Sequence, residues 1–180
     1  FKNVKSTNDV AIRLIKNQKF NRGLVTSEKQ TKGRGTMGKK WVSKKGNLFI
    51  SLFFEINQKK INFKNYSILN AFILKKIISK FANDKINIKW PNDLLYKRKK
   101  ICGILQEAIS FERKNFLIIG VGLNTNFAPY NRGFSSTSLK DIANKRIDNK
   151  KIINDIKNKY EKLLNEITRF SFLKLLKKYK

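Results

Sequence analysis

The chain has 180 residues, 41% of them hydrophobic, which suits one domain with a well-formed core. It has no histidine and one cysteine, which excludes Ser-His-Asp and Cys-His catalysis, an internal disulfide and a Cys/His zinc site. The 41 Lys and Arg residues against 12 Asp and Glu give a net charge of +29, but they are scattered along the chain, which favours compositional bias over a nucleic-acid-binding patch.

The first predicted element is a helix that ends near Asn17. Its start is marked by side chains that can cap a helix N-terminus, namely Ser6, Thr7 and Asn8. Gly23 then predicts a turn, and residues 24–30 predict a strand.

The next two segments differ sharply in composition. Residues 31–46 hold four glycines, five lysines and one arginine, so they bury little and are predicted to form a mobile surface loop. Residues 47–56 are almost all apolar, which predicts an interior strand with both faces buried.

The rest of the chain predicts a helix, several strands and a group of helices. Apolar spacing predicts a core-facing helix over residues 65–82, and residues 86–90 predict a strand that Pro91 ends. Strands joined by polar turns follow within 93–111 and 115–127, and helices are predicted at 138–144, 150–167 and 170–180. This order predicts an α+β domain with a mixed, mostly antiparallel sheet packed against helices.

The sequence also bears on where the protein is located and on the state of its cysteine. No apolar run approaches the roughly 20 residues of a membrane span, and the start FKNVKSTNDV is not a signal peptide, so a cytoplasmic protein is expected. Cys102 is flanked by apolar residues, so it is expected to be a small buried residue rather than a nucleophile.

The segment GRGTMGKKW at residues 33–41 is the most informative one. Its glycines let backbone N–H groups approach an anion, and Arg34, Lys39 and Lys40 add positive charge. Trp41 offers a flat face suited to a purine ring. The alternative is an ordinary basic glycine-rich loop, and the segment matches neither a Walker A loop nor a Rossmann fingerprint.

The segment KWPND at residues 89–93 follows a predicted strand. Lys89 at the strand end can hold a carboxylate and then a developing phosphate charge, and Trp90 is expected in the core. Asp93 is a candidate Mg²⁺ ligand, although turn chemistry alone favours a turn at Asn92 and Asp93.

Two further segments have a structural and a functional interpretation. In GVGLNTN at residues 120–126, the glycines permit close approach to a strand, and Asn124 can pair with an adenine edge. The alternative is a strand end followed by a turn. The STN segment at residues 6–8 is by default a helix cap, but it can also hydrogen-bond a small polar ligand such as a urea carbonyl.

Taken together, these segments resemble the biotin–protein ligases. Members of that family carry STN near a helix start, a GRGRxGRxW loop, KWPND, an AGIL-like strand and a GxGxN segment, in this order. The chain matches with STN at 6–8, GRGTMGKKW at 33–41, KWPND at 89–93, CGIL at 102–105 and GVGLN at 120–124. The resemblance implies a class II synthetase-like ligase fold and activation of biotin by ATP and Mg²⁺ to biotinyl-5′-AMP. The biotin is then transferred to a lysine of a carboxylase's biotin carboxyl-carrier domain.

The resemblance also implies residue roles. Biotin contacts are implied for Ser6, Thr7, Asn8, Gln30, Gly33, Arg34, Gly35, Thr36, Lys89 and Gly103. ATP contacts are implied for Lys39, Trp41, Asn92 and Asn124, catalytic roles for Arg34 and Lys89, and a metal ligand at Asp93. The family's second loop arginine is Thr36 here, which predicts a looser hold on the adenylate.

Other interpretations remain open from the sequence. A lipoate–protein ligase has a similar fold and chemistry, and the charge alone would suit a basic nucleic-acid-binding module. Residues 1–180 are expected to form one catalytic domain, without the N-terminal DNA-binding domain of some members and with their small C-terminal β-barrel absent or truncated. A homodimer paired through an exposed edge strand is an open expectation.

Overall fold

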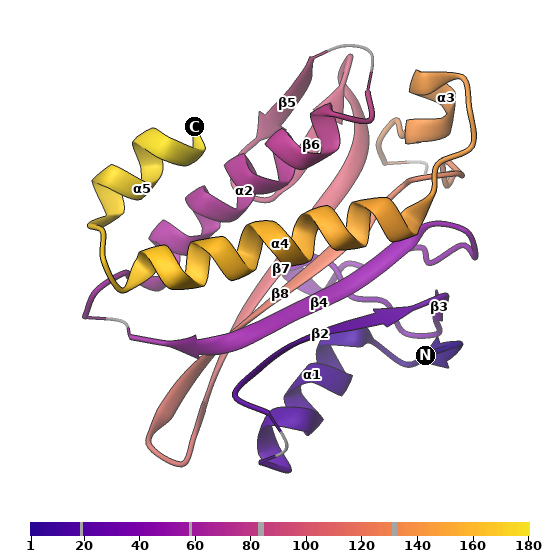
Figure 1. The fold of residues 1–180 in the computed structure, drawn as a ribbon. Coiled ribbons are helices and arrows are strands. Elements are labelled where there is room, and N and C mark those ends of the chain that lie inside the picture. The colour runs from indigo at the N-terminus through magenta and orange to yellow at the C-terminus, as the bar shows by residue number, and fades with distance from the viewer. Residues whose placement is uncertain (19, 58, 83–84, 131–132) are drawn as a thin grey trace.

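The computed structural model describes residues 1–180 apart from 19, 58, 83–84 and 131–132. At its centre is a six-stranded sheet in the order β2-β4-β8-β7-β6-β5, in which all neighbouring strands are antiparallel (Figure 1). The strands are β2 Arg22–Ser27, β4 Leu48–Ile56, β5 Ile86–Lys89, β6 Asp93–Tyr96, β7 Lys99–Phe111 and β8 Lys114–Leu123. A separate parallel pair joins β1 Asn3–Val4 to β3 Lys29–Gln30.

Helices cover the two faces of this sheet unequally. The long helices α2 Phe63–Ser79 and α4 Asn149–Ile167, with α5 Phe172–Tyr179, pack over one face, while α1 Thr7–Lys16 packs against the other (Figure 1). Two short helices, η1 Thr36–Gly38 and α3 Leu139–Ala143, lie in the connections. The prediction of an α+β domain with a mostly antiparallel sheet packed against helices is confirmed, and the parallel pairing lies in the separate β1–β3 pair rather than in the main sheet.

Strand β4 shows how the side chains divide between the two faces. Ile50, Leu52 and Phe54 join the large core beneath α2 and α4, whereas Phe53 joins the smaller core beneath α1. The strand is therefore apolar on both faces because both faces are covered, as predicted from its composition. Ser51 is a fully buried polar side chain within this apolar strand, on the α1 face.

Two local predictions were wrong. Gly23 lies within β2 opposite Phe53 rather than in a turn, and a Cβ at this position would come within 2.6 Å of the Phe53 ring. The glycine is therefore explained by ring packing. Trp90 is 50% exposed rather than in the core, because it follows the edge strand β5 and contacts Phe72 of α2 only edge-on, at a centroid distance of 5.7 Å.

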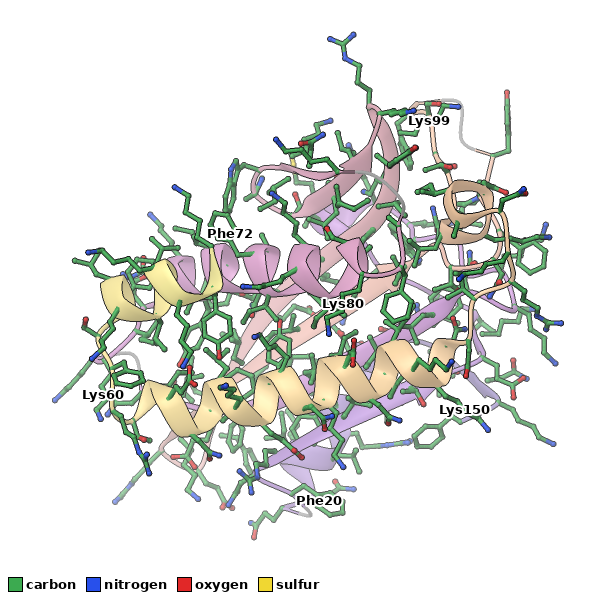
Figure 2. All side chains as sticks on the ribbon, turned by 45° about the horizontal axis from the view of Figure 1, so that its top comes forward. Phe20, Lys60, Phe72, Lys80, Lys99 and Lys150 are labelled. Carbon is green, nitrogen blue, oxygen red and sulfur yellow. The ribbon has the colours of Figure 1, made fainter. Side chains whose placement is uncertain are left out.

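The basic side chains are spread over the molecule. Figure 2 shows Lys60, Lys80, Lys99 and Lys150 at separate places on the visible surface. Lys80 forms an ion pair with Asp155 of α4 at 2.9 Å, which joins α2 to α4. This distribution agrees with charge that comes from overall composition. None of the helices in the described part of the chain combines the length and apolar character needed to cross a membrane.

Candidate functional site

A cleft lies on the sheet face that α1 occupies, between the start of α1, the loop at residues 31–46 and strands β7 and β8. Many residues singled out from the sequence line this cleft although they lie far apart in the chain. These are Ser6, Thr7, Asn8, Gln30, Arg34, Gly35, Thr36, Lys39, Trp41, Asn92 and Gly103. The fold therefore brings the STN segment, the glycine-rich loop and the CGIL strand into one site.

The indole ring of Trp41 lies directly on the sheet, over Gly103 and Gly122. These two glycines face each other on β7 and β8. A Cβ at Gly122 would lie 2.3 Å from Trp41 Cε2, and one at Gly103 would lie 2.6 Å from Trp41 Cζ3. Only glycine leaves room for the ring at this distance. The Trp41 Nε1 donor is buried and has no hydrogen-bond partner among the described residues.

The start of α1 presents a buried hydrogen-bonding cluster. Ser6 occupies the N-cap position but its side chain makes no capping hydrogen bond. The backbone N–H and the hydroxyl of Thr7 both donate to Gln30 Oε1, at 2.8 Å and 3.1 Å. The Ser51 hydroxyl lies 2.7 Å from Thr7 Oγ1 and also bonds Asn8 Oδ1. The STN side chains are thus arranged toward the cleft and sheet rather than around the helix end.

Arg34 connects the glycine-rich loop to two other elements. Its Nη2 donates to Asp9 Oδ1 of α1 at 2.8 Å and to Glu107 Oε2 of β7 at 3.0 Å. The same Glu107 oxygen accepts a hydrogen bond from Asn8 Nδ2 at 2.6 Å. Glu107 belongs to none of the sequence motifs described above, although it is a lone acid in a strand that borders the cleft.

Lys100 supplies a cation that the sequence analysis also missed. It lines the cleft from β7, with its side chain only 18% exposed. Its Nζ lies 2.7 Å from Asp93 Oδ1, 5.3 Å from the centroid of the Trp41 ring and 5.2 Å from that of the Phe134 ring. The ammonium is therefore held by a carboxylate and two aromatic rings, which fixes its position in the cleft.

Lys89, to which the sequence analysis gave a catalytic role, is placed elsewhere. It is exposed at the end of the edge strand β5 and is not among the described residues that line the cleft. The reason is topological, because β6 separates β5 from β7. Among the described residues, Lys100 therefore lines the cleft and Lys89 does not, and the catalytic role of Lys89 stays a prediction.

Three other predicted site residues support the cleft from outside its lining. Gly33 is buried, and its carbonyl accepts the N–H of Trp41 at 2.9 Å. The buried Asn124 amide donates to the carbonyls of Lys100 and Thr137, at 3.5 Å and 3.2 Å, so it braces the strand that carries Lys100. Asp93 pairs with Lys100, and no cluster of three His, Cys, Asp or Glu side chains in the described ranges could hold a metal ion.

Cys102 has the buried position expected of it. It is fully buried and free, and burial raises the pKa of its thiol far above the ordinary value. A thiol with so high a pKa is not a nucleophile at neutral pH. The Lys100 ammonium and the amides and hydroxyls described above are therefore the groups of the site that can bind and polarise a ligand.

Comparison with known proteins shows to which family the chain belongs. The model of the biotin/lipoate A/B protein ligase family matches residues 1–124. The chain belongs to this family. The resemblance inferred from the sequence segments is confirmed.

Family relatives differ in how much of their length is matched. The chain is 34% identical over 179 residues to the bifunctional ligase/repressor BirA of Bacillus subtilis, covering 95% of this chain and 55% of the relative. It is 29% identical over 124 residues to the biotin–[acetyl-CoA-carboxylase] ligase of Mycobacterium tuberculosis, covering 66% and 45%. The chain thus spans about half the length of the curated relatives it matches.

Solved structures agree on the fold. The biotin protein ligase of Aquifex aeolicus in complex with biotin and ATP superposes with a TM-score of 0.76 and 28% identity, covering 96% of this chain and 72% of that one. The Leishmania major enzyme in complex with biotinyl-5-AMP gives a TM-score of 0.79 and 25% identity, covering 99% and 77%. An archaeal lipoate protein ligase from Thermoplasma acidophilum, at 10% identity and a TM-score of 0.59, shares the fold alone.

Proposed function

We propose that this chain is the catalytic domain of an ATP-dependent biotin–protein ligase. It activates biotin to biotinyl-5′-AMP and transfers biotin to a lysine of a carboxylase's biotin carboxyl-carrier domain. One observation carries the proposal: a single cleft joins a buried hydrogen-bonding cluster at the start of α1 to the Lys100 ammonium. Such a cleft matches a ligand with a polar ring at one end and a carboxylate at the other.

The hydrogen-bonding cluster suits the ureido ring of biotin. A ureido group has two N–H donors and one carbonyl acceptor, and the hydroxyls and amides of Thr7, Asn8, Gln30 and Ser51 offer both kinds of partner. Leu105 and Val121 line the same cleft and give apolar surface for the rest of the ligand. The relatives whose names or bound ligands include biotin support this assignment.

Charge neutralisation is the main chemical task of this chain. The biotin carboxylate and ATP repel each other, and Lys100 and Arg34 reduce that repulsion as a carboxylate oxygen attacks the α-phosphorus. Pyrophosphate leaves, and the amine of the carrier lysine then attacks the acyl carbon and releases AMP. Because the carrier supplies this nucleophile, the chain needs no nucleophile of its own, in keeping with a sequence without histidine.

ATP would be bound by the glycine-rich loop at residues 31–46 and by Trp41, whose ring lies over Gly103 and Gly122. Trp41 offers an aromatic face for the adenine, and Lys39 and Lys40 add positive charge for the phosphates. Asn92 lines the cleft, whereas Asn124 acts by bracing β7. Closure of the glycine-rich loop would shield the mixed anhydride from water until the carrier arrives.

Magnesium belongs to the proposal as a companion of ATP. Mg²⁺ is commonly bound by one or two carboxylates together with substrate phosphates, and the single carboxylate of Asp93 beside Lys100 fits that mode. The ion would supply charge neutralisation on the phosphates. Asp93 also orients Lys100 through their ion pair at 2.7 Å.

The setting of the reaction is also part of the proposal. Residues 1–180 would act as one catalytic unit in the cytoplasm, where ATP and the carrier domain meet. The edges of the six-stranded sheet are β2 and β5, so a homodimer paired by strand addition would use one of these two strands.

Exchange of labelled pyrophosphate into ATP tests the proposal. We expect exchange that depends on biotin, because labelled pyrophosphate enters ATP only when it attacks biotinyl-5′-AMP and re-forms ATP and biotin. Exchange with lipoate or octanoate but not with biotin would instead identify a lipoate ligase. Absence of exchange with any of these acids, together with tight and salt-sensitive DNA binding, would identify a nucleic-acid-binding module.

A further inference from the structure

Glu107 lies where three parts of the cleft meet. It extends from β7, and its carboxylate contacts Asn8 of α1 and Arg34 of the glycine-rich loop through the same oxygen, Oε2. Its side chain is 25% exposed, so water competes only partly for these contacts.

We propose that Glu107 is a positioning residue with two separable tasks, one for the ligand pocket and one for the loop. The first task is to orient the Asn8 amide, and the second is to hold Arg34. The pocket task rests on the proposed biotin ligase function, whereas the loop task stands on the contacts alone.

The first task follows from the two ends of the Asn8 amide. Its Oδ1 bonds the Ser51 hydroxyl, and its Nδ2 donates to Glu107 at 2.6 Å. With both ends engaged, the amide has one orientation, and the cluster presents a fixed pattern of donors and acceptors. A Cβ at Gly120 would lie 2.5 Å from Asn8 Oδ1, so the amide is also held against the sheet.

The second task follows from the composition of the loop. Residues 33–38 contain three glycines, so the backbone alone constrains the loop weakly. Arg34 reaches from this segment to carboxylates on two rigid elements, Asp9 of α1 and Glu107 of β7. Charge-assisted contacts of this kind anchor a loop more strongly than neutral hydrogen bonds. Glu107 is thus a fixed point on the sheet that restrains loop opening.

Two substitutions separate the tasks. Glu107→Gln keeps a carbonyl oxygen that can accept from Asn8 but removes the charge that attracts Arg34. Glu107→Ala removes both the acceptor and the charge. Glu55→Gln is the matched control, because Glu55 is a half-exposed acid on β4 that pairs with Lys114 at 3.7 Å and lies outside the cleft lining.

Two measurements read the tasks independently. Trypsin cleavage after Lys39 or Lys40, followed by mass spectrometry without added ligand, reports loop opening. Biotin affinity by calorimetry reports the pocket. We expect Glu107→Gln to speed cleavage about five-fold while leaving the biotin Kd within about two-fold, in line with the modest strength of part-exposed ion pairs. Glu107→Ala should speed cleavage similarly and raise the biotin Kd about ten-fold, as for loss of a partly buried hydrogen bond. Glu55→Gln should change neither readout.

The outcome of each arm is decisive. If the loop is cleaved no faster in either Glu107 variant than in Glu55→Gln, the loop task is wrong. If both variants raise the biotin Kd equally, the pocket task is wrong, because the acceptor kept by Gln would then have no effect. Thermal melting by circular dichroism checks that each variant is folded. Should Glu107→Ala fail to fold, Glu107→Gln alone decides, with faster loop cleavage at an unchanged Tm supporting the proposal and unchanged cleavage overturning it. If the parent chain binds no biotin, the proposed function fails, while the cleavage arm still judges the loop task.

Discussion

The Nζ atom of Lys100 lies 2.7 Å from Oδ1 of Asp93, and this pair joins the two strands of the β6–β7 hairpin beside the cleft. Both side chains are less than one fifth exposed, at 18% and 17%, so their attraction is screened less than that of a surface pair. The pair holds the ammonium 5.3 Å from the centroid of the Trp41 ring and 5.2 Å from that of the Phe134 ring. A residue of the KWPND segment thus acts through a lysine on the next strand.

Substitution of Lys100 should slow adenylation strongly. Lys100→Met keeps most of the side-chain volume but removes the charge that offsets carboxylate–phosphate repulsion. We expect biotin-dependent pyrophosphate exchange to fall by about 100-fold or more, the scale for loss of a key electrostatic group. Lys89→Met is the matched control, since Lys89 is exposed at the end of β5, and its rate should stay within about two-fold of the parent. A larger loss with Lys89→Met than with Lys100→Met would restore the prediction made from the sequence.

A methyl group at Gly122 should displace Trp41. The added Cβ would lie 2.3 Å from the rigid indole, so Gly122→Ala forces the ring off the sheet. We expect the KM for ATP to rise about ten-fold, because ring–adenine contact depends on this position. In a Trp41→Ala background the same substitution should add less than about two-fold, as expected for two residues that act through one contact. Equal effects of Gly122→Ala in both backgrounds would contradict this account.

Thr36 should set how long the adenylate is retained. Its hydroxyl accepts a hydrogen bond from Asn92 Nδ2 at 3.2 Å and offers no guanidinium to a phosphate. We expect Thr36→Arg to slow loss of biotinyl-5′-AMP about ten-fold in a release assay, because a guanidinium that can bind the phosphate through two hydrogen bonds replaces a hydroxyl. Met37→Arg adds the same charge at the next residue, which is 94% exposed, and should leave the release rate unchanged. No slowing with Thr36→Arg would contradict the predicted effect of Thr36 on adenylate retention.

Glu166 should make the fold sensitive to acid. Burial alone would raise the pKa of Glu166, but hydrogen bonds from Lys178 and Tyr179 and the charge of Lys178 outweigh it and lower the pKa below its ordinary value. A carboxyl with a lowered pKa in the fold stabilises it above the ordinary pKa and loses this contribution as pH falls through the lowered value.

Urea unfolding at pH 7 and pH 3 measures this effect. We expect Glu166→Gln to be less stable at pH 7 by roughly 1 kcal/mol, the scale of a hydrogen bond to a charged group at a partly screened site. The difference from the parent should shrink at pH 3. Glu161→Gln, an exposed acid on the same helix, serves as control. An equal difference at both pH values would exclude the titration of Glu166 as the cause.

The helices and strands could be predicted from the sequence because their apolar residues recur with clear helical or strand spacing. The helical spacing of apolar residues in α2 and α4 and the almost entirely apolar sequence of β4 each follow from how that element is covered. Gly23 was assigned to a turn because its partner, the Phe53 ring, lies on another strand. Trp90 was assigned to the core because an edge position is set by strand order, which local pattern does not carry.

The site was predicted where motifs mark it and missed where the fold alone assembles it. Lys100 stands in the run KRKK at 97–100, where nothing local distinguishes it, and only the β6–β7 pairing brings it beside Asp93. Glu107 gains its contacts from residues about 70 to 100 positions away. Ser51 did leave a signal, since a hydroxyl inside an otherwise apolar strand requires a buried partner.

The unequal covering of the sheet separates two kinds of genetic defect. The described residues that line the cleft lie within positions 6–134, while α4 and α5 pack on the opposite face. A substitution that leaves a cavity in that opposite core, such as Leu163→Ala, would lower the free energy of unfolding by about 2–5 kcal/mol. It would thereby lower the amount of folded protein in a cell. The molecules that remain folded would keep their normal substrate constants. Extra gene copies would therefore compensate for a lesion under α4, but not for one such as Lys100→Met, which removes from every molecule the charge that the reaction needs.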